Sequence, residues 1–67
     1  MDAHKLDEII LAIVTANKAP MTIRQIELQV SLREISADTY DVQRSVRRLV
    51  KDHLLTLTPQ LDIAKAS

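Results

Sequence analysis

The chain contains no cysteine, no glycine and only one aromatic residue, Tyr40. Without cysteine the protein can form neither a disulfide nor a thiolate metal site. Without glycine it lacks the loops that bind nucleotide phosphates and the strained turns that present a nucleophilic serine. These absences exclude the dinucleotide-binding, P-loop and serine-hydrolase motifs. They also require every turn to be made from Asn, Asp, Ser, Pro or His residues.

The charge is balanced, with nine basic and nine acidic residues in a chain of 67. A strong, non-specific nucleic-acid binder usually has a global excess of basic residues, so contact with nucleic acid must come from a local cluster. The length allows one modest core, because domains of this size bury only about 60% of their unfolded surface. We therefore expect a homodimer, in which the second subunit adds stability.

Several functional classes are not expected from the sequence. Asp7 and Glu8 interrupt the apolar residues near the N-terminus, so the sequence does not predict a signal peptide. No stretch approaches the roughly 20 apolar residues that a membrane-spanning helix needs. A cytoplasmic location is therefore the default. His4 and His53 lie too far apart for a local metal motif, and no spacing places a serine beside a histidine base. We predict no catalytic residue, metal, cofactor or small-molecule ligand.

Apolar residues at helical spacing predict a first helix over about residues 3–17, with Asp2 as its N-cap. Leu11 points away from the apolar face and is a candidate contact between subunits. Asn17 and Pro20 are expected to end the helix, because asparagine tolerates a left-handed cap and proline disfavours continuation. The inward face consists of Leu6, Ile9, Ile10, Ile13 and Val14.

A second helix is expected over about residues 23–30, preceded by a short strand. Thr22 and Gln25 have the spacing of a capping box, in which each side chain bonds to the backbone N–H of the other residue. Ser31 and Glu34 repeat that spacing, which indicates either a further helical turn or a break near Ser31.

A third helix is predicted over about residues 38–53, and its two sides differ in character. One side is apolar, while the other presents cations at three- and four-residue spacing. Such a charged row is usually a solvated helix face. A helix that buries its other side, however, can also lie along a phosphate backbone. The apolar side comprises Val42, Val46, Leu49, Val50 and His53, and the basic side Arg44, Arg47, Arg48 and Lys51 with Tyr40.

A β-hairpin is expected over residues 54–64. Leucine and threonine alternate over residues 54–58, Pro59 and Gln60 form a turn, and the alternation resumes at residues 61–63.

Three helices, a strand after the first and this hairpin form a mainly α pattern that resembles the winged helix-turn-helix family. The likeness covers nearly the whole chain and depends on two segments. Residues 22–26 are similar to the start of the family's second helix, and residues 42–50, followed by Leu54 and Leu55, are similar to a recognition helix that runs into the wing. The resemblance implies a single winged-helix domain with a short C-terminal β-hairpin as its wing.

The resemblance also implies that the third helix enters the major groove of DNA. Gln43 would then read adenine and Arg44 or Arg47 guanine, while Arg48 and Lys51 would hold phosphates. Packing of Tyr40 against the second helix is an equally good explanation of that residue, and Gln43 is also explained as a neutral surface residue. The implied DNA-binding residues are Thr39, Tyr40, Gln43, Arg44, Arg47, Arg48 and Lys51.

Two functions fit this pattern. The first is a small dimeric DNA-binding transcriptional regulator that uses the third helix as its major-groove reader. The alternative is a winged-helix protein-protein interaction module, such as a small mobile-element protein that binds and inhibits a host factor. Asp38 and Asp41 favour the alternative because they would repel phosphate, and the hairpin has no basic residue before Lys65. His53 stands where the family commonly has a glycine, and we expect it to be either the C-cap of the third helix or a histidine at the edge of the core, and not a ligand or a switch.

Overall fold

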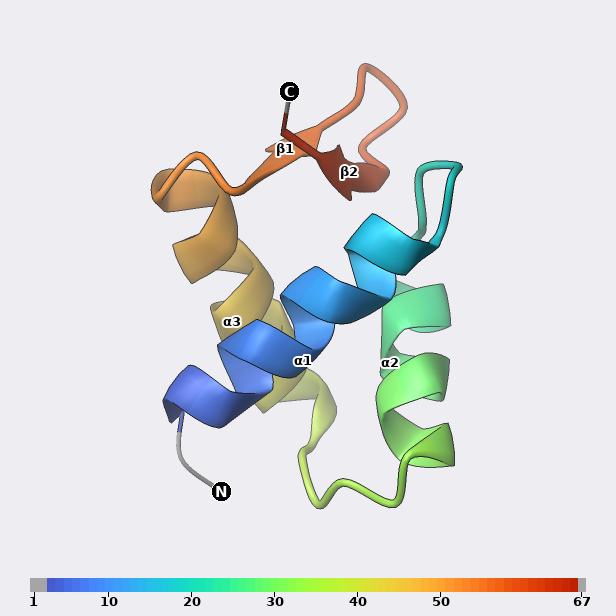
Figure 1. Cartoon of the computed structure of the whole chain (residues 1–67), viewed down its shortest axis with the longest axis vertical. Helices are drawn as coiled ribbons and strands as arrows, with labels where there is room; N and C mark the ends of the chain where they lie inside the picture. The colour runs from blue at the N-terminus through green and yellow to red at the C-terminus, as the bar shows by residue number, and fades with distance from the viewer. Residues whose placement is uncertain (1–2, 67) are drawn as a thin grey trace.

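The computed structural model describes residues 3–66, which form three helices followed by a two-stranded antiparallel hairpin (Figure 1). This layout confirms the mainly α, winged helix-turn-helix fold class. Each helix begins and ends within two residues of its predicted bounds. Within residues 3–66, none of the helices has the length and apolar character required to cross a membrane. The elements are α1 (Ala3–Ala16), α2 (Ile23–Leu32), α3 (Thr39–Lys51), β1 (Leu55–Leu57) and β2 (Ile63–Lys65).

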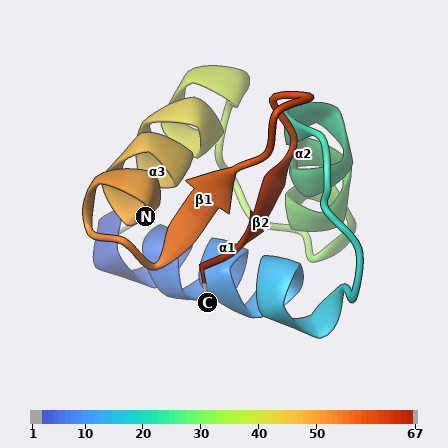
Figure 2. The ribbon, with the colours of Figure 1, turned by 90° about the horizontal axis from the view of Figure 1, so that it is seen from above.

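One hydrophobic core lies between the helices and the hairpin. α1 packs against both α2 and α3, and the hairpin lies across one end of the three helices, over α1 and between α3 and α2 (Figure 2). Every residue expected on the inward face of α1 is buried except Ile9, which is half-buried against the same core. The core consists of Leu6, Ile10, Ile13, Val14, Met21, Ile26, Val30, Val42, Val46, Leu49, Leu55 and Ile63.

The capping box predicted before α2 is confirmed. The Gln25 N–H donates to Thr22 Oγ1 (3.1 Å), and the Thr22 N–H donates to Gln25 Oε1 (2.9 Å). The short strand expected there is reduced to a single bridge, in which Met21 and Ile63 exchange backbone hydrogen bonds of 2.8 and 2.7 Å. This bridge ties the start of α2 to β2. The N-cap predicted at Asp2 lies outside the described residues.

Leu11 does not lie on the surface as expected. Its side chain is half-buried and packs against the core cluster. A Leu11→Asp substitution would therefore disturb folding, and its effect on a dimer could not be separated from that disturbance.

α3 ends in a Schellman motif whose left-handed residue is His53, with a φ of 62°. The N–H of His53 bonds to the Val50 carbonyl (3.0 Å), and the N–H of Leu54 bonds to the Leu49 carbonyl (2.9 Å). These bonds satisfy two carbonyls that the helix end leaves free. His53 therefore takes part in the cap of α3, at the left-handed position directly after the C-cap residue Asp52. Its expected place on the apolar side of α3 is wrong, because it is exposed in the turn beyond the end of the helix.

α2 ends in a similar way at Glu34, whose φ is 57°. The Glu34 N–H bonds to the Ser31 carbonyl (3.0 Å), and Ser31 lies inside the last turn of α2. Of the two alternatives for Ser31 and Glu34, the break near Ser31 is confirmed, because α2 ends at Leu32; Glu34 ends this helix and does not form a second capping box. Leu61 in the hairpin turn is also left-handed, with a φ of 65°. The turns of this chain are therefore not made from Asn, Asp, Ser, Pro and His alone, as its lack of glycine suggested. Asn17 is not left-handed, and its side-chain Nδ2 donates to the Ala19 carbonyl (2.6 Å).

We expect His53→Gly to raise the free energy of unfolding by about 0.5–1 kcal/mol. The left-handed conformation costs a residue with a Cβ about 1–2 kcal/mol, and the greater freedom of glycine in the unfolded chain offsets part of that gain. Urea denaturation monitored by circular dichroism would measure the change. Gln29→Gly, within α2, is the control and should be destabilising by about 1 kcal/mol. Equal destabilisation by both substitutions would contradict the assignment.

Candidate nucleic-acid interface

α3 has one buried side and one solvent-facing side. Val42, Val46 and Leu49 are buried against the rest of the core. A capping box fixes the start of the helix, because the Asp41 N–H donates to Asp38 Oδ1 (2.8 Å) and the Asp38 N–H donates to Asp41 Oδ2 (3.3 Å). The two aspartates that seemed unfavourable for DNA therefore serve the helix N-terminus, where negative charge is stabilising.

Three cations lie on the solvent-facing side of α3 and define what we call the basic row: Arg44, Arg47 and Lys51. All three are exposed, and within residues 3–66 none of them forms a salt bridge. Thr39 is exposed at the start of the same helix, and Gln43 is half-buried beside the row. The helical spacing thus correctly predicted that Thr39, Arg44, Arg47 and Lys51 lie on the side of α3 away from the core.

Tyr40 lies next to the basic row and not against α2. Its side chain is 62% exposed, and the Arg44 guanidinium carbon is 5.5 Å from the centre of its ring. A cation–π contact of this kind contributes about 0.5–1 kcal/mol at an exposed site. Packing against α2 therefore does not explain Tyr40, whereas positioning of the Arg44 side chain does.

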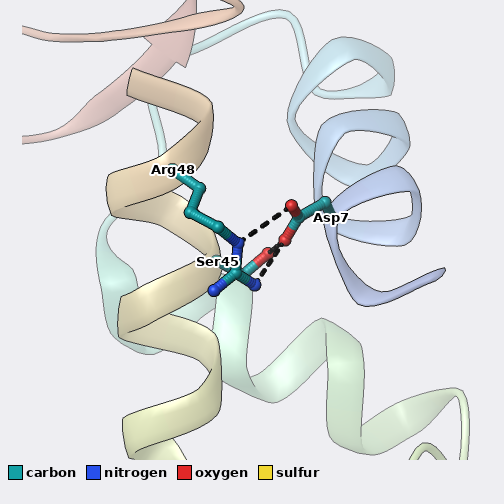
Figure 3. Close-up of polar contacts among 3 residues, drawn as sticks. All are labelled: Asp7, Ser45 and Arg48. Carbon is teal, nitrogen blue, oxygen red and sulfur yellow. Dashed lines mark hydrogen bonds and ion pairs between the residues drawn. The ribbon is translucent and has the colours of Figure 1, made fainter. Parts of the chain in front are cut away.

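Arg48 does not belong to the basic row, although its spacing suggested that it did. Figure 3 shows its side chain turned toward Asp7 of α1. Arg48 Nη2 lies 2.8 Å from Asp7 Oδ1, and its Nε donates to Oδ2 at 3.1 Å. Ser45, which is completely buried, donates its hydroxyl to the same carboxylate. The predicted contact of Arg48 with a phosphate is therefore wrong, because the Arg48 guanidinium binds Asp7 and joins α3 to α1.

The charge of Asp7 is stabilised by this arrangement. Burial, the largest single influence, would raise the pKa of the Asp7 carboxyl. Hydrogen bonds from Arg48 and Ser45, together with the positive charge of Arg48, outweigh burial and hold that pKa below its ordinary value. The same hydrogen bond raises the pKa of Arg48. The Asp7–Arg48 pair is therefore charged at neutral pH and fixes how α3 sits on α1.

The hairpin presents apolar side chains where a basic wing would present cations. Leu57 at the end of β1 is 50% exposed, and Leu61 in the turn is 75% exposed. The turn is closed by two hydrogen bonds, from the Thr58 N–H to the Asp62 carbonyl and from the Leu61 N–H to the Thr58 carbonyl, both of 2.8 Å. The hairpin thus offers little to a phosphate backbone, in line with the sequence.

An open groove of about 380 Å³ lies between α3 and the hairpin, and we call it the α3–wing groove. Sequence analysis gave no sign of it, because its walls come from four elements, α2, α3, β1 and β2. Apolar side chains make up most of the lining and two members of the basic row lie on its rim; the full set is Ile23, Gln43, Val46, Arg47, Val50, Lys51, Leu57 and Ile63.

Comparison with known proteins found no matching family model, no similar curated protein and no similar solved structure. Functional inference therefore depends on the geometry of α3 and the hairpin. Within residues 3–66, no group of three or more His, Cys, Asp or Glu side chains is placed to hold a metal ion.

Proposed function

We propose that the protein is a small DNA-binding regulator of transcription that inserts α3 into the major groove. The main support is the basic row: three exposed cations, about one helical turn apart, on a helix whose opposite side is buried. No salt bridge competes for these cations within the described residues. A rigid helix with an exposed cationic side is the usual arrangement for major-groove reading.

In this proposal the residues of α3 have different roles. Arg44 and Arg47 contact guanine edges and Gln43 contacts adenine, because these side chains suit the donor and acceptor patterns of those bases. Lys51, near the C-terminal end of the helix, holds a phosphate. Thr39 and Tyr40 line the entry of the helix into the groove.

Three exposed cations per subunit, of which only Lys51 holds a phosphate on a specific site, are few, so the proposal includes two copies bound to a palindromic site. Its expected setting is the cytoplasm. The exposed leucines of the hairpin favour the alternative function, a winged-helix module that binds protein, because they provide apolar contacts and no phosphate contacts.

The test is a titration of labelled random-sequence duplex DNA at two salt concentrations. On random-sequence DNA, where Arg44 and Arg47 have no selected guanines to contact, all three cations of the basic row should meet phosphates, and the logarithmic salt slope should be about −2.7 per subunit. Affinity should then fall roughly 40-fold per subunit between 50 and 200 mM salt. Fluorescence anisotropy would measure both values.

The control is Lys18→Ala, which removes one exposed positive charge from the turn after α1. This variant should keep the wild-type slope, while the triple alanine variant of the basic row should lose it. No binding at 50 mM salt and about 100 µM protein would contradict the proposal and favour a protein partner.

A further inference from the structure

We propose that the α3–wing groove binds an acidic amphipathic helix of a partner protein. The helix would place apolar side chains in the groove and carboxylates on the cations of its rim. This inference does not depend on DNA binding, since it rests on the shape and charge of the groove alone.

The floor of the groove is apolar and part of it faces solvent. Val46 and Ile63 are buried beneath it, Val50 is half-buried at its side, and Leu57 is half-exposed at its edge. These side chains come from α3 and from both strands of the hairpin, so the core holds the walls in place. Covering Leu57 and Val50 would remove apolar surface from water, which favours an apolar occupant.

The rim of the groove determines the charge of that occupant. Arg47 and Lys51 lie four residues apart on α3, and the lining contains no carboxylate. Side chains at this spacing are about 5–6 Å apart at their Cβ atoms, as are two carboxylates one turn apart on a docking helix. Gln43 adds an amide at the other end of the same side of α3. An acidic helix therefore matches the rim in charge and in spacing.

The openness of the groove argues for a peptide and against a small molecule. Ligand pockets bury most of the ligand, commonly 70–90% of its surface. This groove lies along one side of α3 and is broadly open to solvent, so it would leave a small molecule largely exposed. An amphipathic helix needs only a groove for its apolar side, with anchors at three- and four-residue spacing.

The probe is a fluorescein-labelled peptide of about 14 residues, long enough for helix formation on binding, with leucines on one side and glutamates flanking them. We expect a Kd of about 10–100 µM by anisotropy, measured without DNA. Methyl NMR signals of Val46, Val50, Leu57 and Ile63 should shift together. One control peptide has serine for each leucine and the same charge, and another has glutamine for each glutamate; both should bind at least about fivefold more weakly.

Two protein variants separate the apolar and the charged contributions. Leu57→Ser should weaken peptide binding about fivefold, while Leu61→Ser, which is more exposed and lies outside the groove, should leave it unchanged. Changing both Arg47 and Lys51 to glutamate should weaken binding at least about tenfold, while Lys18→Glu should have little effect. Methyl NMR signals of the core residues Ile10, Val14 and Ile26 that keep their wild-type positions in each variant without peptide would confirm folding.

Three results of the peptide titrations would overturn the inference, and a fourth result would come from the protein alone. The three titration results are no binding at about 1 mM peptide, equal binding of the serine-substituted peptide, and wild-type binding by Leu57→Ser. Shifts of the same methyl signals when the protein alone is concentrated would assign the groove to a second copy of this chain, which also overturns it. Because bound peptide would cover Arg47 and Lys51, it should displace DNA from α3. If the protein does not bind DNA at all, the peptide titrations still test the groove by themselves.

Discussion

Asp7→Ala is expected to lower the free energy of unfolding by about 2 kcal/mol. The substitution leaves the completely buried Ser45 hydroxyl without its acceptor, which costs about 1–3 kcal/mol. It also removes the partner of Arg48. That side chain is 38% exposed, so water screens the ion pair and its loss adds less than about 1 kcal/mol. Urea denaturation at pH 7 would measure the change.

Two controls distinguish the loss of the Ser45–Asp7 hydrogen bond from the effect of any substitution near the N-terminal end of α1. Glu8→Ala changes the next residue, which is exposed, and should alter stability by less than about 0.5 kcal/mol. Adding Ser45→Ala to Asp7→Ala should recover about 1 kcal/mol, because the orphaned hydroxyl is then gone. An Asp7→Ala variant as stable as Glu8→Ala would contradict the role assigned to the carboxylate.

The lowered pKa of Asp7 determines how this stabilisation depends on pH. Because the pKa is lower in the folded protein than in the unfolded chain, the stabilisation is complete above the unfolded pKa. It is lost as the pH falls through the folded pKa. The difference in stability between wild type and Asp7→Ala should therefore narrow as the pH falls from about 5 through the folded pKa. A difference that stays constant over this range would show that the charge of Asp7 contributes nothing.

The second large effect is expected on DNA binding. Arg44→Ala and Arg47→Ala should each cost about 1–3 kcal/mol on a selected site and relax the sequence preference, if both read bases. The double variant should then bind at least about 30-fold more weakly than wild type. Lys51→Ala should instead weaken binding to all sequences by a similar factor. Titrations on the selected site and on a scrambled duplex would distinguish the two patterns.

Lys18→Ala is again the matched control, because it removes the same charge from a turn that is not part of α3. Arg48→Ala is a poor probe of DNA contact, since its guanidinium is bonded to Asp7 and its loss would affect stability. Unchanged affinity in the Arg44, Arg47 and Lys51 variants would remove the mechanism proposed for DNA binding.

The sequence alone determined the order and bounds of the helices. Hydrogen bonds within a helix join residues four apart, and the capping box at Thr22 and Gln25 acts within one turn, so both can be recognised from local spacing. The absence of glycine and cysteine excluded whole classes of site. Helical periodicity also placed the basic row on the side of α3 opposite the core. These properties depend on neighbours in the chain and need no tertiary structure.

The tertiary structure alone decided which side chains of α3 are available. Arg48 has the same local spacing as its basic neighbours, but its partner Asp7 lies 41 residues earlier in the chain, on α1. Leu11 is half-buried because of how the core packs, and the α3–wing groove exists only where Ile23, Val50 and Leu57 meet. Contacts between distant segments have no local signature, because they depend on how the helices pack.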